Sequence, residues 1–318
     1  MKKRKANSRS ASDSDGEEDD VLTYSYQPKS ANLKHGDDSP GGDWIDASFD
    51  FCDPCEDDIQ NVKALLINGG LYPGSLVTDS VVKCLCNQGN IGAIVKAENE
   101  ESDSAVAVLS ILNVQQYDEM KCVKNFLLSL ARQHASSSVF REFETILNSP
   151  TNSVGYFVNE RFINLPPSLV PQMFTVIQED ILWSQNIPEM PVEERPFYSF
   201  SHLIGYSIFY SRDEGIPFEK KQKAGSMSDN ISVFYRKFEE EELFNASELC
   251  FCWSTNQQVR LNCESQSPSE NSNSPKTQTF QEKKMIYVVP YSKLSSVIKH
   301  LKEREPIDLN AKIETLTA

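Results

Sequence analysis

The chain lacks any long apolar run. In its 318 residues no stretch approaches the roughly 20 apolar residues that a membrane-spanning helix needs. The first residues, MKKRKANSRSASDSDGEEDD, include no hydrophobic segment of the kind found in secretory signals. We therefore expect a protein of the cytosol or nucleus with no membrane contact. In that reducing environment its eight cysteines are expected to be free thiols.

Cationic residues are also scarce. The chain has 31 Lys and Arg against 46 Asp and Glu, which gives a formal net charge of -15 at pH 7. Binding to nucleic acid depends on cations that displace counterions from phosphates, so this balance argues against nucleic acid as a direct partner. An acidic protein instead attracts basic proteins. The acidic charge is concentrated in residues 11–60, where 15 acidic side chains accompany only Lys29 and Lys34.

The signatures of common catalytic and cofactor sites are missing as well. No glycine-rich phosphate loop follows a predicted strand, and no H-E-x-x-H or G-x-S-x-G motif occurs. The four histidines, at positions 35, 134, 202 and 300, are scattered among a polar tail, helix ends and a strand. We therefore predict no catalytic residue and no cofactor.

Cysteine spacing raises one metal or redox hypothesis. The sequence CDPC at 52–55 has the spacing of half a zinc site or of a thioredoxin-type redox pair. A zinc site needs two further ligands, however, and other cysteines occur as C-x-C pairs on a predicted helix and a predicted strand. Cys250 and Cys252 then share one face of the strand, which favours their interpretation as small core residues.

Composition divides the chain into segments. Residues 1–42 have few apolar positions and are predicted to form a disordered tail with a basic block followed by an acidic one. Residues 263–279 are similarly polar and are predicted to form a disordered loop inside a domain that spans 43–304. Residues 305–318 are predicted to be a flexible C-terminal tail.

The N-terminal tail carries two candidate regulatory signals. A basic cluster has the composition of a nuclear-import signal, which predicts a nuclear protein that also shuttles through the cytoplasm. It consists of Lys2, Lys3, Arg4 and Lys5. Ser12 and Ser14 each precede an acidic residue by three positions, a pattern that acidophilic kinases recognise. Phosphorylation there would deepen the negative block.

Within the predicted domain, helical and strand-like patterns alternate. Strands are predicted at 44–51, 91–97, 104–114, 153–165, 195–210, 231–238, 248–255 and 283–290. Helices are predicted at 56–70, 75–89, 118–133, 137–147, 168–184 and 291–303. The near-continuous apolar run at 104–114 is typical of a central strand covered on both faces. The patterns predict an α+β (mixed α/β) fold with a single central sheet flanked by helices.

The acidic run FEEEEL at 238–243 is expected to form a solvated face. The alternative is that it belongs to a docking surface for a basic partner.

The segment NERFINLPPSLVPQMF, residues 159–174, places a Glu-Arg pair in an otherwise core-like stretch. If the segment begins as a strand, Glu160, Phe162 and Asn164 share one face, and Arg161 and Ile163 share the other. The charged residues then come first along the strand, and the residues that make apolar contacts follow them. We expect the charged pair to be a structural ion pair, with a binding role as the alternative.

The prolines of this segment predict a corner. Pro166 and Pro167 are unable to donate to a sheet ladder, so they would end the strand. Ser168 would then cap a helix, with Pro171 at its third position, where an N–H group has no intrahelical acceptor to lose. The prolines therefore need no catalytic role.

Several blocks together resemble a known family. They are DDIQNVKALL, GNIGAIVK, VLSILNV, VGYFVNERFINLPPSLVPQM and MIYVVPYSKLSSVIKHLKE, in this order and after an acidic tail. Over roughly residues 43–304 they are similar to the BCCIP family, and ERFIN-PP is the most specific of the motifs.

The resemblance implies a nuclear, non-catalytic protein that binds other proteins. A fungal relative escorts a newly made large-subunit ribosomal protein and assists nuclear export of a lipid kinase, which implies a basic client, ribosome biogenesis and protein transport. Animal relatives bind a recombination protein and a cyclin-kinase inhibitor, which implies the alternative of a cell-cycle and DNA-repair scaffold. The client and the dominant role stay open.

The family fold is similar to that of the GNAT N-acetyltransferases, which implies a second alternative, a divergent acyltransferase. An acetyl-CoA site needs a loop of the form [QR]-x-x-G-x-[GA], whose N–H groups bind pyrophosphate at a helix start. The nearest candidate, QGNIGA at 88–93, has Ile91 in place of the required glycine. The sequence therefore predicts the fold without the acetyl-CoA loop.

Overall fold

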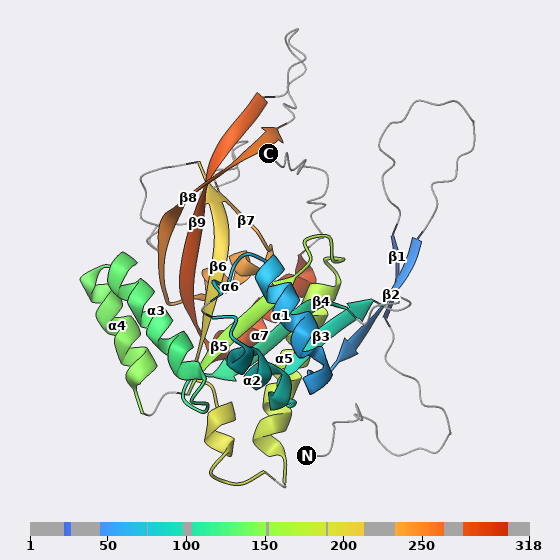
Figure 1. The fold of residues 1–318 in the computed structure, drawn as a ribbon, viewed down its shortest axis with the longest axis vertical. Coiled ribbons are helices and arrows are strands. Elements are labelled where there is room, and N and C mark those ends of the chain that lie inside the picture. Colours follow the sequence, from blue (N-terminus) through green and yellow to red (C-terminus); the bar gives the residue numbers. More distant parts are fainter. Residues whose placement is uncertain are drawn as a thin grey trace.

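The computed structural model describes residues 22–26, 45–74, 76–97, 104–150, 153–188, 190–212, 233–263 and 276–304. One sheet forms the centre, and helices cover both of its faces (Figure 1). The strands are β1 (Leu22–Tyr26), β2 (Ile45–Cys52), β3 (Gly92–Ala97), β4 (Ala105–Asn113), β5 (Val154–Arg161), β6 (His202–Ser211), β7 (Val233–Tyr235), β8 (Leu249–Cys263) and β9 (Lys276–Pro290). The α-helices are α1 (Ile59–Asn68), α2 (Asp79–Gln88), α3 (Met120–His134), α4 (Ser137–Asn148), α5 (Leu169–Asn186), α6 (Glu239–Ala246) and α7 (Leu294–Glu303). Single 3-10 turns are η1 (Glu56–Asp58), η2 (Arg195–Tyr198) and η3 (Tyr291–Lys293).

The strand order is β1-β2-β3-β4-β5-β6-β9-β8, with β7 paired to the far end of β6. Neighbouring strands are antiparallel except for β5 and β6, which are parallel. This parallel pair is short, because only Val154–Phe157 of β5 lies in register with His202–Gly205 of β6. Beyond it the strands separate, and β7 takes the place of β5 beside β6. The predicted fold class, mixed α+β with one central sheet flanked by helices, is confirmed.

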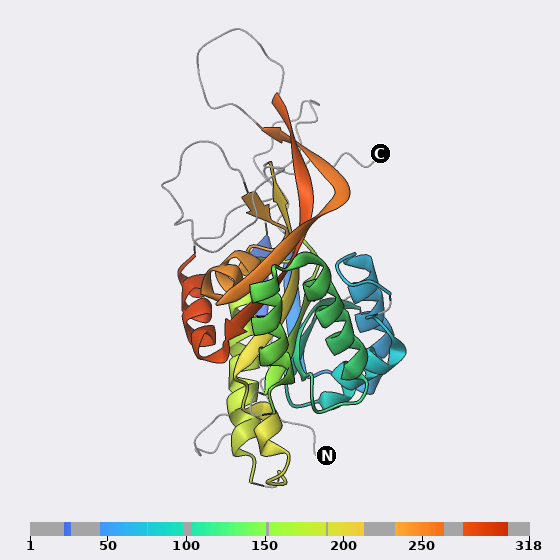
Figure 2. The ribbon, with the colours of Figure 1, turned by 90° about the vertical axis from the view of Figure 1, so that its left-hand side faces the viewer.

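The two faces of the sheet have separate apolar cores. Helices α1 to α4 cover one face, and α5, α6 and α7 cover the other, as the side view shows (Figure 2). On β4, Val108 and Leu112 face the first core, while Leu109 and Ile111 face the second. This strand is therefore covered on both sides, which explains its near-continuous apolar sequence.

Helix α2 begins later than the sequence predicts. The predicted helix starts at Ser75, but the chain first forms a turn in which Leu76 and Val77 donate to the carbonyl of Pro73. The helix starts at Asp79, and the hydroxyl of Thr78 accepts from Val81 N at 3.3 Å as a side-chain cap. Local turn chemistry therefore overrides the helical spacing.

Described strands lie within two of the segments that the sequence predicts to be disordered. Strand β1 lies inside residues 1–42 and pairs with β2. Strands β8 and β9 pair as far as Cys263 and Lys276, so both ends of the predicted 263–279 loop are strand. The two strands continue beyond the body of the sheet as a twisted ribbon (Figure 1). Residues 1–21, 27–44, 264–275 and 305–318 lie outside the described residues.

Among the helices that the structure describes, none is both long and apolar enough to span a bilayer.

Candidate interaction site where β5 and β6 separate

The predicted corner after β5 is present, but a turn forms it before the prolines are reached. Strand β5 ends at Arg161 rather than Leu165, and Leu165 N donates to Phe162 O at 3.2 Å. Pro166 and Pro167 follow this turn, and their carbonyls accept from the first two N–H groups of α5 at 3.0 and 3.2 Å. The prolines therefore start the helix instead of ending the strand.

The start of α5 agrees with the prediction in one respect and differs in another. Pro171 is the third residue of the helix, as expected. Ser168 precedes the helix, but its backbone is already helical and its side chain forms no capping hydrogen bond. The expected Ser168 cap is wrong, because an N-cap side chain reaches the following N–H groups from an extended backbone.

Burial along the motif is the reverse of the expected order. Glu160 and Arg161 are 0% and 6% exposed, whereas Phe162 and Ile163 are 46% and 53% exposed. Asn164 is exposed as well. The two charged residues thus lie in the interior, and the apolar residues that follow them lie on the surface.

A short segment closes the gap between β5 and β6. After β7, Arg236 N donates to Ile208 O of β6 at 3.2 Å, and the chain then turns into α6. This places Lys237, Glu239 and Glu240 between the separating strands, with exposures of 2%, 0% and 1%. With Glu160 and Arg161, they form a buried charge cluster of three carboxylates and two cations.

The strongest contact of the buried charge cluster joins β5 to α6. Arg161 donates from Nε and Nη2 to the two carboxylate oxygens of Glu239, each at 2.9 Å. Asn159 Nδ2 donates to the same carboxylate at 3.2 Å. Burial opposes ionisation of Glu239, but the guanidinium outweighs burial and lowers the pKa of this carboxyl to about 2. The pair is therefore fully ionised at neutral pH.

Lys237 joins the other two carboxylates. Its Nζ lies 3.6 Å from Glu160 Oε1 and 3.4 Å from Glu240 Oε1, and it donates to the backbone carbonyl of Asn159. Ser207 Oγ of β6 lies 2.6 Å from Glu240 Oε2. Burial, with the negative charges of neighbouring glutamates, raises the pKa of Glu240 to about 7. With Glu240 protonated, two carboxylates balance two cations.

A glycine allows the cluster to pack against α1. A Cβ atom at Gly69 would overlap the carboxyl group of Glu160, so a larger residue here would have to displace this buried side chain. Gly70, rather than Gly69, has the left-handed backbone conformation, with φ of 66°. The absence of a side chain at Gly69 therefore allows close approach to a buried carboxylate.

The last two glutamates of the acidic run face α7. Arg304 Nη2 lies 2.8 Å from Glu241 Oε2, and Arg304 Nη1 lies 3.4 Å from Glu242 Oε1. The expectation that residues 238–243 form a solvated face is therefore wrong: Glu239 and Glu240 are buried, and the next two glutamates are half-buried and paired. The run looks solvated in the sequence because the cations that pair with it lie far away in the chain.

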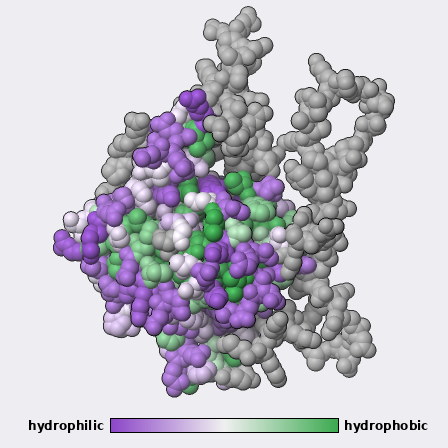
Figure 3. Space-filling view, in the orientation of Figure 1, coloured by the Kyte–Doolittle hydropathy of each residue, from purple (hydrophilic) through white to green (hydrophobic). Residues whose placement is uncertain are grey.

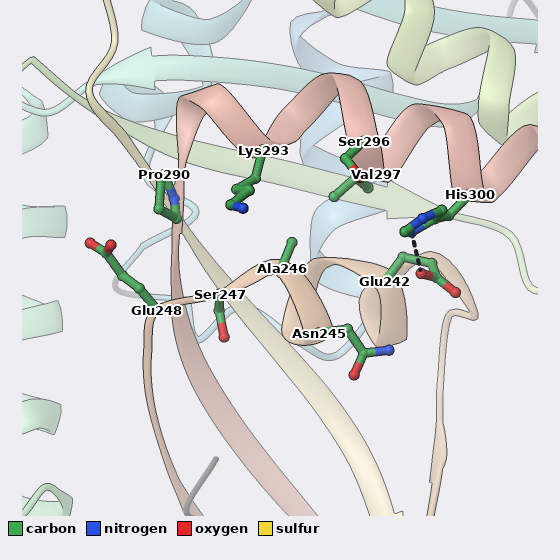
Figure 4. Close-up of a pocket in the computed structure, with 10 residues that line it drawn as sticks. All are labelled: Glu242, Asn245, Ala246, Ser247, Glu248, Pro290, Lys293, Ser296, Val297 and His300. Atoms are coloured by element: carbon green, nitrogen blue, oxygen red, sulfur yellow. Dashed lines mark ion pairs between the residues drawn. The ribbon is translucent and has the colours of Figure 1, made fainter. Parts of the chain in front are cut away.

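A shallow hollow of about 470 Å³ lies between α6 and α7 (Figure 4). His300 Nδ1 lies 3.5 Å from Glu242 Oε2 at one end, and Glu248 at the other end lies 2.9 Å from His202 Nε2. The lining residues are Glu242, Asn245, Ala246, Ser247, Glu248, Pro290, Lys293, Ser296, Val297 and His300. Charges of both signs line the hollow, so its surface does not favour a ligand of either sign.

Comparison with known proteins places the chain in a family. A family model described as BCCIP matches residues 44–243. The chain belongs to the BCCIP family. The matched range includes every residue of the buried charge cluster, whereas α7 and Arg304 lie beyond it.

The chain is similar to named members of the BCCIP family. It is 28% identical over 202 residues to a protein BCCIP homolog of Arabidopsis thaliana, which covers 63% of this chain and 60% of that protein. It is 27% identical over 222 residues to protein bcp1 of Aspergillus oryzae, which covers 66% of this chain and 71% of that protein. The crystal structure of BCP1 from Saccharomyces cerevisiae has a TM-score of 0.50 at 16% identity, covering 80% and 87%. That last likeness is one of fold.

The acetyl-CoA candidate QGNIGA lies between α2 and β3 in this BCCIP chain. Gln88 is the last residue of the helix, and Gly92 is the first of the strand. A pyrophosphate cradle requires N–H groups at a helix start, whereas this segment follows a helix end. The backbone N–H groups of QGNIGA therefore lie between a helix end and a strand, and not at the helix start where an acetyl-CoA loop places them.

The CDPC cysteines serve local packing. Cys55 Sγ donates to Asp58 Oδ2 at 3.1 Å, and burial raises the pKa of this thiol. Cys250 and Cys252 both pack against the core under α5 to α7, as expected for one face of a strand. Among the residues with described positions, no group of three or more His, Cys, Asp and Glu side chains is arranged to hold a metal.

The remaining predicted sites fall outside the description. The structure does not describe the basic cluster or the two candidate phosphorylation sites. These residues are Lys2, Lys3, Arg4, Lys5, Ser12 and Ser14. Sequence reasoning missed Lys237, Glu239 and Glu240 as interior residues. Their position between two aromatic strand segments, VFY and LCFCW, could have predicted burial, because both flanking segments are apolar.

Proposed function

We propose that this protein is a non-catalytic nuclear chaperone or adaptor that binds a basic protein client, namely a large-subunit ribosomal protein, and supports ribosome biogenesis and nuclear transport. Membership of the BCCIP family supports a protein-binding role. The observation that carries the proposal is the buried charge cluster in the gap between β5 and β6.

The gap is where a small-molecule site would be expected on geometric grounds. Ligands of sheets with parallel strands bind in the crevice beyond the carboxyl ends of those strands. Here that crevice is filled by Lys237, Glu239 and Glu240, which are almost fully buried and paired to β5 and β6. Opening it would separate the buried Arg161–Glu239 ion pair and break its two hydrogen bonds. Binding at the outer surface needs no such rearrangement.

Charge supports a basic client. A formal net charge of -15 produces a long-range field that draws in cationic proteins and shields their phosphate-binding side chains. A ribosomal protein of high isoelectric point has this chemistry. Its association should be fast and should weaken as salt screens the field.

The test is a titration of the full chain with purified large-subunit ribosomal proteins, with an acidic protein of similar size as the control. Biolayer interferometry would be run between about 50 and 300 mM salt, where the screening length falls severalfold. We expect saturable binding of at least one basic protein, a slower association rate at high salt, and no binding of the control. Affinity independent of salt, or micromolar binding of acetyl-CoA, would contradict the proposal.

Nuclear location is tested separately, through the N-terminal tail. A fluorescent fusion of the full chain is expected in the nucleus. Replacement of Lys2, Lys3, Arg4 and Lys5 by alanine should move it to the cytoplasm, whereas the Lys29→Ala variant should behave as the parent chain. Unchanged nuclear accumulation of the first variant would remove the basic cluster from the proposal.

A further inference from the structure

One part of the chain combines exposed apolar residues with a complete lack of cations. Residues 162–194 contain no Lys, Arg or His, although they include five acidic residues. Large hydrophobic side chains that the structure describes as exposed are Ile67, Phe162, Ile163, Leu182, Trp183 and Val192. All of these except Ile67 belong to this cation-free stretch. Exposed apolar groups that lie close together mark interaction surfaces more often than isolated ones do.

Three of the exposed side chains lie at the C-terminal end of α5. Leu182 and Trp183 are 49% and 38% exposed on the last turns of the helix, and Val192 is 73% exposed in the loop that follows. That loop is fixed against the helix, because Arg195 Nη2 donates to Ile187 O at 3.2 Å and Gln185 Nε2 donates to Tyr198 O at 2.8 Å. Both ribbon views show this end projecting below the sheet (Figures 1 and 2).

Two exposed carboxylates border these apolar side chains. Glu179 lies one helical turn before Leu182 and Trp183, and Glu193 follows Val192 directly. We call Glu179, Leu182, Trp183, Val192 and Glu193 the α5 patch. The nearest cation along the chain, Arg195, is half-buried and donates to a backbone carbonyl. The α5 patch therefore combines exposed apolar side chains with exposed carboxylates that lie within a few residues of them along the chain.

We propose that the α5 patch docks a basic amphipathic segment of the protein client. Apolar side chains of that segment would cover Leu182, Trp183 and Val192, and its Lys or Arg side chains would pair with Glu179 and Glu193. The inference rests on the proposed function, because it takes the client to be basic. Tryptophan is enriched among the residues that dominate binding energy, and exposed carboxylates select cationic partners.

Charge complementarity favours this occupant over a second copy of the chain. A twofold interface would bring the same patch of two copies together, so the carboxylates of one copy would face those of the other without a cation from residues 162–194. Like charges placed across an interface oppose association. The face drawn in Figure 3 has both hydrophilic and apolar areas.

The test compares variants of the full chain for binding to the purified basic ribosomal protein that binds the parent chain most tightly. The Leu182→Ser/Trp183→Ala variant should raise its Kd at least about tenfold, because it removes the apolar anchors. The Ile67→Ser variant, with an equally exposed apolar residue on α1, should bind as the parent does. The Glu179→Lys/Glu193→Lys variant should slow association and reduce its salt dependence, whereas the Glu142→Lys variant, altered on α4, should change both less.

Two further measurements keep the outcome clear if a variant folds poorly. Thermal unfolding followed by circular dichroism reports on folding, and a photo-crosslinking residue at Val192 should capture the client where one at Ile67 does not. Parent-like binding by both patch variants would overturn the α5 patch and leave the proposed function intact. A parent chain that binds no basic protein would overturn both. Dimers that dissociate only in the patch variants would assign the surface to a second copy instead.

Discussion

The buried charge cluster gives the sharpest test of the structure, through the substitution Arg161→Met. This change keeps much of the apolar stem but removes both N–H donors that bind Glu239 at 2.9 Å. The carboxylate is then left buried without its main partner. Removal of one member of a buried pair costs about 3–5 kcal/mol, so the free energy of unfolding at pH 7 should fall by about that amount.

The pH dependence gives an independent measure of the same pair. The pKa of Glu239 is about 2 in the folded protein against an ordinary value of 4.5. A lowered folded-state pKa gives stability that is present above pH 4.5 and is lost as the pH falls toward 2. The shift corresponds to about 3 kcal/mol. In the Arg161→Met variant this loss on acidification should largely disappear, because the guanidinium no longer favours the ionised carboxyl.

Urea unfolding followed by circular dichroism at several pH values measures both effects. The Arg141→Met variant is the matched control, since Arg141 is exposed on α4 and its loss should change stability by less than about 0.5 kcal/mol. The double variant Arg161→Met/Glu239→Leu should recover part of the loss, because no buried charge remains unpaired. A cost below about 1 kcal/mol for Arg161→Met, or a double variant no more stable than the single one, would refute this reasoning.

Three further predictions concern stability. The pKa of Glu240 is raised to about 7, so the free energy of unfolding should fall as the pH rises from 4.5 through 7. The Glu240→Gln variant should lose this dependence. Urea unfolding at pH 8 should show it to be more stable than the parent by up to about 3 kcal/mol. Gly69→Ala should cost about 1–3 kcal/mol through overlap with a buried carboxyl, whereas Gly74→Ala has open space; equal melting temperatures for the two would contradict the close approach. Thr78→Ala should cost about 1 kcal/mol by loss of its cap, and Ser168→Ala should be close to neutral, which thermal melts will distinguish.

The sequence predicts the regular elements better than their ends. Apolar spacing identifies α7, and the unbroken apolar run of β4 indicates a strand covered on both faces. Two predicted boundaries are wrong. A turn at Pro73 delays the start of α2, and a turn after Arg161 ends β5 early. Such turns depend on one or two local backbone hydrogen bonds, which the spacing of apolar side chains does not reveal.

The candidate site was less predictable than the fold. The motif at 159–167 was identified, yet Glu160 and Arg161 were expected to pair with each other. Their partners are instead Lys237, just before α6, and Glu239, its first residue, which lies 78 residues beyond Arg161. A run of four glutamates is typical of a solvated face, so its burial depends on cations that topology alone brings near. These charges pair because the fold brings β5, β6 and α6 together, and no local sequence pattern predicts that arrangement.

The buried charge cluster also helps to fix the position of α6 where the parallel strands β5 and β6 separate. An apolar plug between β5 and β6 would fill the space but would lack the geometric specificity of bidentate, charge-assisted hydrogen bonds. The bidentate contact to Glu239 and the bond from Ser207 to Glu240 hold successive residues of α6 to different strands. Phe238 adds a further restraint, since its ring lies 5.5 Å from the Arg161 guanidinium and 5.6 Å from that of Arg304. Helix α7 is thereby tied to the same position as α6, so the second core is assembled in a single register around the gap.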